Sequence, residues 1–508
     1  MKLKTIFLCL ILFLEINANF LRVMDSSTNN FDYSSYKAVS SNTDLTSQTL
    51  SSSTSDQSVV YITESGKKIT DSNLNKESGE SSNIENSEFY GVNAAVLVQG
   101  GDLTISGGTI TTKTKGANAL CVTNNGKVTI SETKIISTAS SSGRGLHATY
   151  GGEITASKVE ISSTGGSCAT LATDRGEGTV TCSECTLSTA GAGSPLIYST
   201  GNILVSQSTG TATGAQAVVV EGKNTATVKD SSELKCSGKG NTDTDIDKCG
   251  VMLYQSMSGD ADSGTSTFNC QSSTISIESS SSVYSSAPMF FITNTDAQIN
   301  IDSCTFSYGS NIFLKTGGTS RWGSTGSNGG VVTLNLRNQA VVGNFIIDEY
   351  SGLTINLENS SIEGTINSDK TGAKVEINLD EKSSITLTGN SYYTSLNNGK
   401  ENGDNINKGT YKFESYEEKE ISRPSSSGNG DSHGSGQGEG DPHGPGEGGD
   451  PHGPGEGGDS PFPSNLPTPP PGNKPEDDSE DEGEEENYDT YLRYFYIIAL
   501  ISIVEFIF

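Results

Sequence analysis

Acidic, basic and aromatic residues recur at one position of a repeated segment in the middle of the chain. Aromatic rings stack on sugars, and carboxylates orient sugar hydroxyls or cations. If the repeats stack, these side chains form one edge that suits a glycan. The plainer interpretation is a row of solvent-facing turn residues that pair with one another. The set comprises Tyr150, Asp174, Arg175, Glu177, Tyr198, Glu221, Lys223, Tyr254, Gln255, Asn294 and Asp296.

The same edge holds the groups that a calcium-dependent, pectate-type polysaccharide lyase requires. Such a lyase needs carboxylates for Ca²⁺ and a basic group, here Arg175, to take the proton beside the uronate carboxylate. A glycoside hydrolase needs a pair of carboxylates, and the sequence carries only an isolated Asn294-Thr295-Asp296. We therefore assign no catalytic residue and keep the lyase as the alternative to a non-enzymatic binding protein.

A group of three aspartates is the sequence feature that most resembles a metal site. Asp243, Asp245 and Asp247 alternate like the start of a calcium loop, but the following glycine and the distal glutamate are missing. We therefore interpret them as a solvated loop, and expect no cofactor other than Ca²⁺.

Eight cysteines follow the first apolar segment, and an even number in a secreted chain permits disulfides without defining their pairing. Cys182-x-x-Cys185 is interpreted as structural, because no second Cys/His pair lies near it in the sequence. The eight are Cys121, Cys168, Cys182, Cys185, Cys236, Cys249, Cys270 and Cys304.

The elements that must position these residues are short repeated strands. Similar segments begin at glycines spaced 25, 26, 26 and 23 residues apart, and each is followed by a third apolar piece such as NALCV near Cys121. Alternating aliphatic and polar residues, with no helical stretch between them, predict coils of three strands each. The pattern loosens over 229–267 and shortens after Gly330. The repeats begin at Gly101, Gly126, Gly152, Gly178 and Gly201.

Several segments of this region resemble a family of secreted right-handed parallel β-helix proteins that are described as adhesin-like or pectin-lyase-like. The resemblance covers roughly residues 89–396, and it implies the handedness of the coil but little about function. It is carried by Arg144-GLHATYGG, Ala172-TDRGEGTVT, Ser194-PLIYSTGNI, Val218-VVEGKN, Gly250-VMLYQSMSGDA, Pro288-MFFITNTDA and Arg321-WGSTGSNGG.

The two ends predict export and attachment to a membrane. Residues 1–18 read as a secretory signal peptide, and the apolar tail 488–508 reads as a lipid-anchor signal or a retained anchor. Gly483 and Ser479 are the candidate lipid-attachment residues. Asn359 begins the glycosylation sequon Asn-Ser-Ser. Together these features predict a secreted protein that is tethered to the cell surface.

The intervening segments predict one folded region between two polar ones. Residues 19–88 are rich in Ser, Thr and Asn and read as mostly disordered, with a candidate cap strand at 59–63. The all-β region, a parallel β-helix, is expected over 89–400. A short connection follows over 401–422, and then a stalk of Gly, Pro and acidic residues over 423–487.

The net charge of the chain limits the kinds of partner that it is expected to bind. The chain has 508 residues and a formal net charge of −29, which argues against nucleic acid as a partner because phosphate binding needs clustered Lys and Arg. The expected partners are an extracellular glycan or protein ligand, and a membrane through the tail. The leading hypothesis is an adhesin-like surface protein, and a structural coat component is a further alternative.

Overall fold

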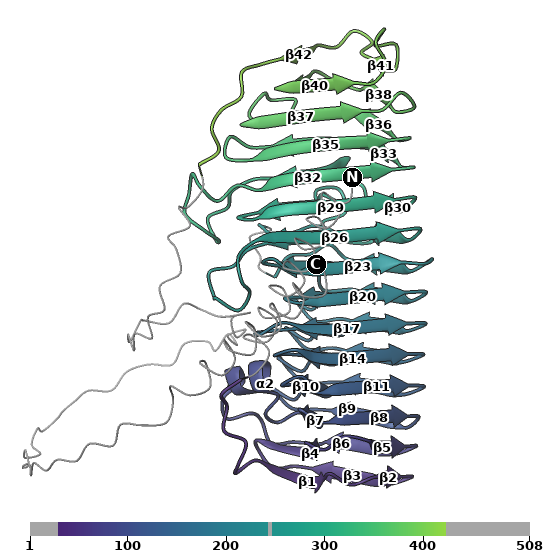
Figure 1. Cartoon of the computed structure of the whole chain (residues 1–508), viewed down its shortest axis with the longest axis vertical. Helices are drawn as coiled ribbons and strands as arrows, with labels where there is room; N and C mark the ends of the chain where they lie inside the picture. The colour runs from purple at the N-terminus through teal and green to yellow at the C-terminus, as the bar shows by residue number, and fades with distance from the viewer. Residues whose placement is uncertain (1–28, 242–245, 423–508) are drawn as a thin grey trace, which may run out of the picture. The chain divides into compact units, whose positions relative to one another are not determined.

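The computed structural model describes residues 29–241 and 246–422, which form a parallel β-helix. Strands of successive coils stack as neighbours from β1 to β42 (Figure 1). Three long sheets result, which we call sheets A, B and C. Sheet B has 14 strands, and at about 4.8 Å per coil the stack is roughly 60 Å long.

Sheet A has 12 strands and carries the third strand of each coil. Its strands alternate between core-facing and outward-facing residues, as at Leu120, Cys121 and Val122 of β10. In order, they are β1 (Lys37–Ser41), β4 (Gln57–Ile62), β7 (Val96–Gln99), β10 (Leu120–Thr123), β13 (Leu146–Ala148), β16 (Leu171–Thr173), β19 (Ile197–Ser199), β22 (Val218–Glu221), β25 (Val251–Tyr254), β28 (Phe290–Thr293), β31 (Ile312–Thr316) and β34 (Asn344–Ile347).

Sheet B supplies the longest strands of the stack. In order, they are β2 (Leu45–Thr46), β5 (Lys67–Thr70), β8 (Asp102–Ser106), β11 (Lys127–Ser131), β14 (Gly152–Ser157), β17 (Gly178–Ser183), β20 (Asn202–Ser206), β23 (Thr225–Lys229), β26 (Thr265–Gln271), β29 (Asp296–Asp302), β32 (Val331–Arg337), β35 (Gly352–Glu358), β37 (Lys374–Leu379) and β40 (Ser395–Asn398).

Sheet C follows sheet B around each coil. Its strands are β3 (Thr49–Ser52), β6 (Asn73–Lys76), β9 (Thr109–Thr112), β12 (Lys134–Ser137), β15 (Glu160–Ser163), β18 (Thr186–Thr189), β21 (Thr209–Ala212), β24 (Glu233–Cys236), β27 (Thr274–Ile277) and β30 (Thr305–Ser307). A four-stranded sheet, β33 (Ala340–Val342), β36 (Ser361–Gly364), β38 (Ser384–Leu387) and β41 (Ile406–Asn407), and the pair β39 (Ser391–Tyr393) and β42 (Phe413–Ser415) complete the last coils.

In the interior, buried side chains at the same position of successive coils stack in rows. In sheet B, Ile105, Ile130 and Ala156 are register partners in consecutive coils, and all are buried. A one-residue slip would turn such a row outward, so the aliphatic alternation fixes the register. This confirms the inward-facing positions that the repeat predicted.

The corner between sheets B and C bends at one residue. Glu132, Lys158 and Glu184 occupy this corner in successive coils with φ between 52° and 55°. Left-handed backbone is unusual for residues other than glycine. The corner recurs because the neighbouring coil holds it: the Glu132 N–H donates to the Ser157 carbonyl at 3.2 Å.

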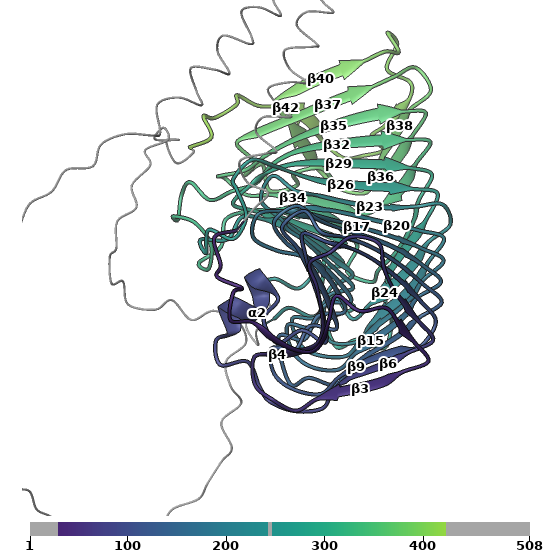
Figure 2. The ribbon, with the colours of Figure 1, turned by 60° about the horizontal axis from the view of Figure 1, so that its bottom comes forward.

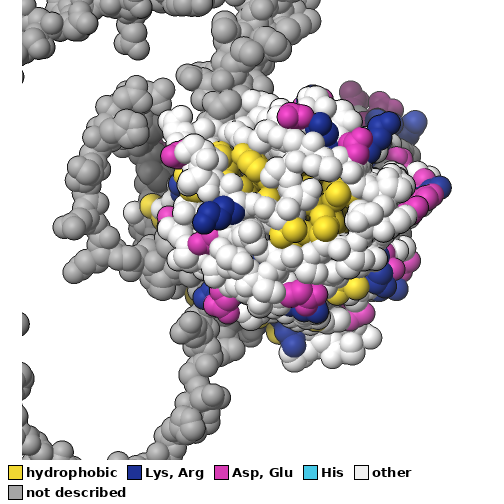
Figure 3. Space-filling model, turned by 90° about the horizontal axis from the view of Figure 1, so that it is seen from below, with side chains coloured by type: hydrophobic (Ala, Val, Ile, Leu, Met, Phe, Trp, Pro, Cys, Tyr) yellow, Lys and Arg dark blue, Asp and Glu magenta, His cyan; other side chains and the backbone are white. Residues whose placement is uncertain are grey.

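The β-helix extends further in both directions than the repeat predicted. The first two coils, β1 to β3 and β4 to β6, lie within residues 37–76, where the sequence predicted mostly disorder. The expected cap strand at 59–63 is β4, an ordinary rung of the second coil, because Val60 pairs with Ser40 below it and Val96 above it. Figure 3 shows hydrophobic side chains at the centre of this end. The predicted connection 401–422 contributes β41 and β42.

The outer face of sheet A is covered by other parts of the chain. Helix α2 (Ile84–Tyr90) begins at Asn83, whose side chain accepts the Asn86 N–H, and ends at Gly91 with φ of 72°. It lies beside the coils on the side of β4 (Figure 2). The expected insertion 229–267 is two loops on either side of β25, since β24 and β25 continue the coil through it. These covers bury outward-facing side chains and frame a cavity.

Four of the eight cysteines pair. Cys182 bonds to Cys185 across one corner, which agrees with a structural role, and Cys270 bonds to Cys304 of the next coil. The other four predicted candidates, Cys121, Cys168, Cys236 and Cys249, are buried free thiols, so the structure has two disulfides among these eight. Burial raises the pKa of Cys121 and of Cys236 to about 12.

Candidate functional site

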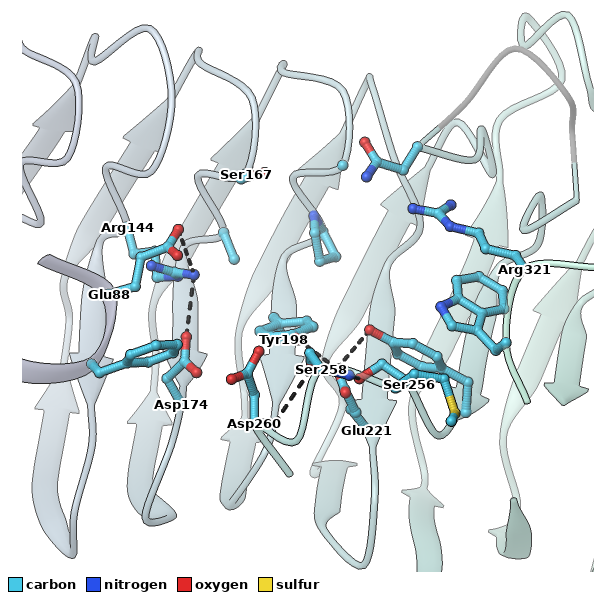
Figure 4. Close-up of a pocket in the computed structure, with 18 residues that line it drawn as sticks. Glu88, Arg144, Ser167, Asp174, Tyr198, Glu221, Ser256, Ser258, Asp260 and Arg321 are labelled. Carbon is cyan, nitrogen blue, oxygen red and sulfur yellow. Dashed lines mark hydrogen bonds and ion pairs between the residues drawn. The ribbon is translucent and has the colours of Figure 1, made fainter. Parts of the chain in front are cut away.

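A cavity of about 390 Å³ lies over the outer face of sheet A. We call it the sheet A pocket. Its lining includes Trp322, Tyr198 and Tyr254, which belong to a small hydrophobic cluster around Met252. Figure 4 shows its side chains converging from α2, from the strands and from the covering loops. The lining mixes carboxylates, guanidinium groups and aromatic rings.

One end of the sheet A pocket is organised by Arg144. Its guanidinium contacts Glu88 of α2 at 3.3 Å and Asp174 at 3.2 Å (Figure 4). Burial raises the pKa of Asp174 to about 7, against the opposing effect of Arg144, and Glu88 raises it further. Arg144 Nη1 has no hydrogen-bond partner among the described residues. This end therefore holds a carboxyl group that exchanges its proton near neutral pH.

His147 lies beside this group on β13. Its Nε2 is 3.9 Å from Asp174 Oδ2, and the ring is fully buried. Burial first, and Arg144 second, hold the pKa of His147 well below its usual range. The imidazole is thus neutral at physiological pH.

The other end is organised by Glu221, the last residue of β22. Its Oε2 accepts hydrogen bonds from the hydroxyls of Tyr198 and Tyr254, each at 2.6 Å (Figure 4). Burial, followed by the nearby Glu221, raises the pKa of both tyrosines well above the usual value, so both hydroxyls stay protonated and donate. Glu221 is 1% exposed, and its Oε1 has no partner among the described residues.

The loop before β32 closes this end with Arg321 and Trp322. The Trp322 and Tyr254 rings have centroids 4.9 Å apart. The Arg321 guanidinium lies 4.7 Å from the Trp322 ring centroid and contacts Asp247 at 3.2 Å. These contacts fix the wall of the pocket.

Four of the predicted edge residues meet at the sheet A pocket: Asp174, Tyr198, Glu221 and Tyr254. Stacking explains this, because Glu221 and Tyr254 are register partners and Asp174 ends the same outward row two coils earlier. The sequence therefore located part of the pocket correctly. It did not predict that the row is covered and buried.

The other predicted edge residues are engaged outside the pocket lining. Arg175 contacts Asp260 at 2.7 Å and lies 3.9 Å from the Phe89 ring centroid. Lys223 pairs with Glu177 and Asp262 at 2.9 and 2.8 Å. These pairs match the plainer interpretation of mutually paired surface residues.

The remaining four contact α2, their own loop or the preceding coil, or begin a strand. The Tyr150 ring stacks on Tyr90, with centroids 5.8 Å apart. Gln255 donates to the Ala261 carbonyl, and Asn294 donates to the Gln255 carbonyl. Asp296 is the exposed first residue of β29.

Sequence reasoning missed most of the charged lining: Glu88, Arg144, Asp260 and Arg321. Glu88 and Asp260 lie outside the repeated strands, so periodicity could not reveal them. Arg144 and Arg321, however, begin two of the segments that carry the family resemblance. Their place at the start of these segments was the sequence feature that could have identified them as lining residues.

Other predicted sites have separate outcomes. Asp247 holds Arg321, whereas Asp243 and Asp245 lie outside the described residues, as do Ser479, Gly483, the signal peptide and the tail. Within residues 29–241 and 246–422, no group of three His, Cys, Asp or Glu side chains is placed to hold a metal ion. No helix in these ranges is long and apolar enough to cross a bilayer. Asn359 occupies an exposed corner, where its Nδ2 donates to Asn338 at 2.8 Å.

A second hollow of about 660 Å³ lies on the outer face of sheet B. Its floor is a row of stacked asparagines, which we call the asparagine ladder. Each amide donates to the preceding one at 2.7–2.8 Å. The ladder consists of Asn269, Asn300, Asn335, Asn356 and Asn378.

Comparison with known proteins supports the fold. Residues 58–233 match the family model described as "Right handed beta helix region". No curated protein and no solved structure matches the chain. The matched residues span β4 to the start of β24, and the same parallel stacking continues to β42. The chain is accordingly a right-handed parallel β-helix protein.

Proposed function

We propose that this chain is a non-enzymatic, adhesin-like surface protein that binds extracellular glycans in the sheet A pocket. The observation that carries the proposal is the buried Glu221 carboxylate in the pocket lining, with one oxygen bound by two tyrosine hydroxyls and the other without a hydrogen-bond partner among the described residues. Buried polar groups normally have partners, so an unpartnered carboxylate oxygen in a cavity favours a ligand with donor groups.

The shape and lining of the pocket favour a sugar chain. Its volume lies within the 300–1,000 Å³ usual for ligand sites. Arg144 and Glu221 are on coils three rungs apart, or about 14 Å at 4.8 Å per coil. A ligand that reaches both ends must therefore be elongated. The rings of Tyr198 and Tyr254 provide apolar surface between the polar groups, whereas one face each of Phe89 and Trp322 is already covered by Arg175 and Arg321.

The lyase alternative requires a free base beside the substrate. Arg175, the predicted base, is held by Asp260 and by the Phe89 ring. Arg144 is held by two carboxylates. These contacts favour binding over proton abstraction. Secretion and tethering by the chain ends, which would display the rod outside the cell, remain part of the proposal.

A glycan array with the full mature chain tests this function. We expect binding that the Trp322→Ala and Tyr254→Phe variants weaken, since the first loses part of the pocket wall and the second loses a hydroxyl that donates to Glu221. Tyr411→Phe is the matched control, because Tyr411 is exposed and does not line the pocket. An array without hits would overturn the glycan proposal in favour of a structural coat component.

Catalysis is tested separately. The mature chain is incubated with pectate and Ca²⁺, and the absorbance of unsaturated uronides is followed. No growth is expected. Growth that disappears in Arg175→Ala would overturn the non-enzymatic proposal.

A further inference from the structure

Glu221 differs from every other charged side chain that lines the sheet A pocket. Arg144 is paired with Glu88 and Asp174, Arg321 with Asp247, and Asp260 with Arg175. Glu221 has no ion pair among the described residues and receives only two tyrosine hydroxyls, both on Oε2. A buried carboxylate without a cation is costly, so a cationic ligand group would complete the arrangement.

The aromatic lining at this end also suits a cation. The faces of aromatic rings attract positive charge when the cation lies within about 6 Å of the ring centroid. One such contact is already present at this end, where the Arg321 guanidinium lies 4.7 Å from the Trp322 ring centroid. Tyr198 and Tyr254 stand on neighbouring outward rows around Glu221 (Figure 4). The hydroxyls of both rings point at Glu221 Oε2, which leaves Oε1 as the oxygen that an ammonium group would contact at this end.

We propose that the Glu221 end of the sheet A pocket binds the protonated amine of an amino sugar. The inference rests on the proposed glycan-binding function and specifies its ligand class. The ammonium group donates to Glu221 Oε1, while the rings of Tyr198 and Tyr254 contact the sugar carbons. A uronate at this end would meet the Glu221 carboxylate with like charge, and a neutral sugar would leave that charge uncompensated.

Three tetrasaccharides with the same β-1,4 backbone test the proposal by isothermal titration calorimetry on the full mature chain. The glucosamine tetramer carries free amines, its N-acetylated form carries amides, and cellotetraose carries hydroxyls at the same carbon. We expect the glucosamine tetramer to bind at least tenfold more tightly than either other ligand. Its affinity should fall as the pH rises and the amines lose their protons.

Variants assign the effect to Glu221. Glu221→Gln keeps the shape and an acceptor for the tyrosines, and should weaken binding of the glucosamine tetramer at least tenfold while leaving cellotetraose unchanged. Glu233→Gln is the control, because Glu233 is exposed and pairs with Lys235 away from the pocket. If Glu221→Gln fails to fold, Tyr198→Phe provides a second test, with a smaller weakening expected from the loss of one hydrogen bond.

The outcomes separate the two proposals. Equal binding of the three tetrasaccharides would overturn amine recognition and leave glycan binding intact. Binding of none of the three, together with an empty glycan array, would overturn both. Capture of a lysine-rich peptide without any amino sugar would overturn the glycan assignment, because the cation would then come from a protein.

Discussion

Sheets A and B are built from the same coils, yet their outer faces differ in kind. Sheet A is covered by α2 and by loops, and it buries Arg144, His147, Asp174 and Glu221. The outer face of sheet B has no such cover and carries charged pairs such as Lys127 with Glu153, both more than half exposed. The strands of both sheets alternate inward-facing and outward-facing residues in the same way. The difference therefore comes from α2 and the loops, which are added to the coils on the side of sheet A.

The outward side chains of the two sheets also differ in whether their polar atoms have hydrogen-bond partners. On sheet B, outward side chains of successive coils bond to one another along the rod. In the asparagine ladder, for example, the Asn335 and Asn356 amides each donate to the asparagine of the preceding coil. On sheet A, the coverings exclude water and leave Arg144 Nη1 and Glu221 Oε1 without partners among the described residues. A cavity therefore forms where loops bury a row of side chains that the repeat would otherwise expose.

The largest expected difference concerns ion pairs on the two faces. Arg144→Ala leaves Glu88 and Asp174 without their cation in a buried site, which should cost about 3–5 kcal/mol of unfolding free energy. Lys127→Ala removes an exposed pair and should cost less than about 1 kcal/mol. Urea denaturation of both variants measures this. Equal losses would show that the sheet A pocket is open to solvent.

The next difference concerns pH. Unfolded Asp174 ionises near pH 4, whereas the folded group keeps its proton up to about pH 7. The folded state therefore binds more protons between these values, and stability falls by roughly 2–4 kcal/mol as the pH rises through this window, then stays level above it. Asp174→Asn should remove this fall when urea midpoints are compared from pH 4 to 8.

Asp302, on the outer face of sheet B, serves as the control, because its pKa is shifted in the opposite direction to that of Asp174. A hydrogen bond from Ser303 lowers the pKa of Asp302. Its stabilising effect is present above about pH 4 and is lost as the pH falls through the lowered pKa. Asp302→Asn should therefore leave the slope between pH 4 and 7 unchanged. Parallel curves for wild type and Asp174→Asn would contradict a buried, protonated Asp174.

The smallest difference lies within sheet B. Asn335→Ala removes two ladder hydrogen bonds, to Asn300 and from Asn356, and should cost about 1–2 kcal/mol. Thr129→Ala changes the equivalent outward position in a coil outside the asparagine ladder and should cost less than about 0.5 kcal/mol. Thermal or urea unfolding distinguishes them. Equal effects would mean that the ladder adds no stability beyond the strand itself.

Much of the fold was predictable because it depends on local alternation. The row Ile105, Ile130 and Ala156 is legible from spacing alone, and so is the shorter repeat after Gly330. The first coil was missed because Leu45 and Leu50 are isolated among Ser and Thr. They are stabilised by stacking on Ile69 and Leu74 of the next coil, which local composition does not reveal.

The site was predictable only where it belongs to the repeat. Asp174, Glu221 and Tyr254 follow from stacking, since their positions recur from coil to coil. Glu88, Asp260 and Trp322 reach the pocket from a helix and from loops, and their approach depends on tertiary folding. Spacing within a repeat carries no information about segments that leave it.

The position of the sheet A pocket along the rod has an evolutionary consequence. Its lining ends at Trp322, before β32, and the coils from β32 to β40 carry none of it. Duplication of one such coil would lengthen the rod by about 4.8 Å and leave recognition untouched. The length of the rod can therefore change without any change in the residues that line the sheet A pocket.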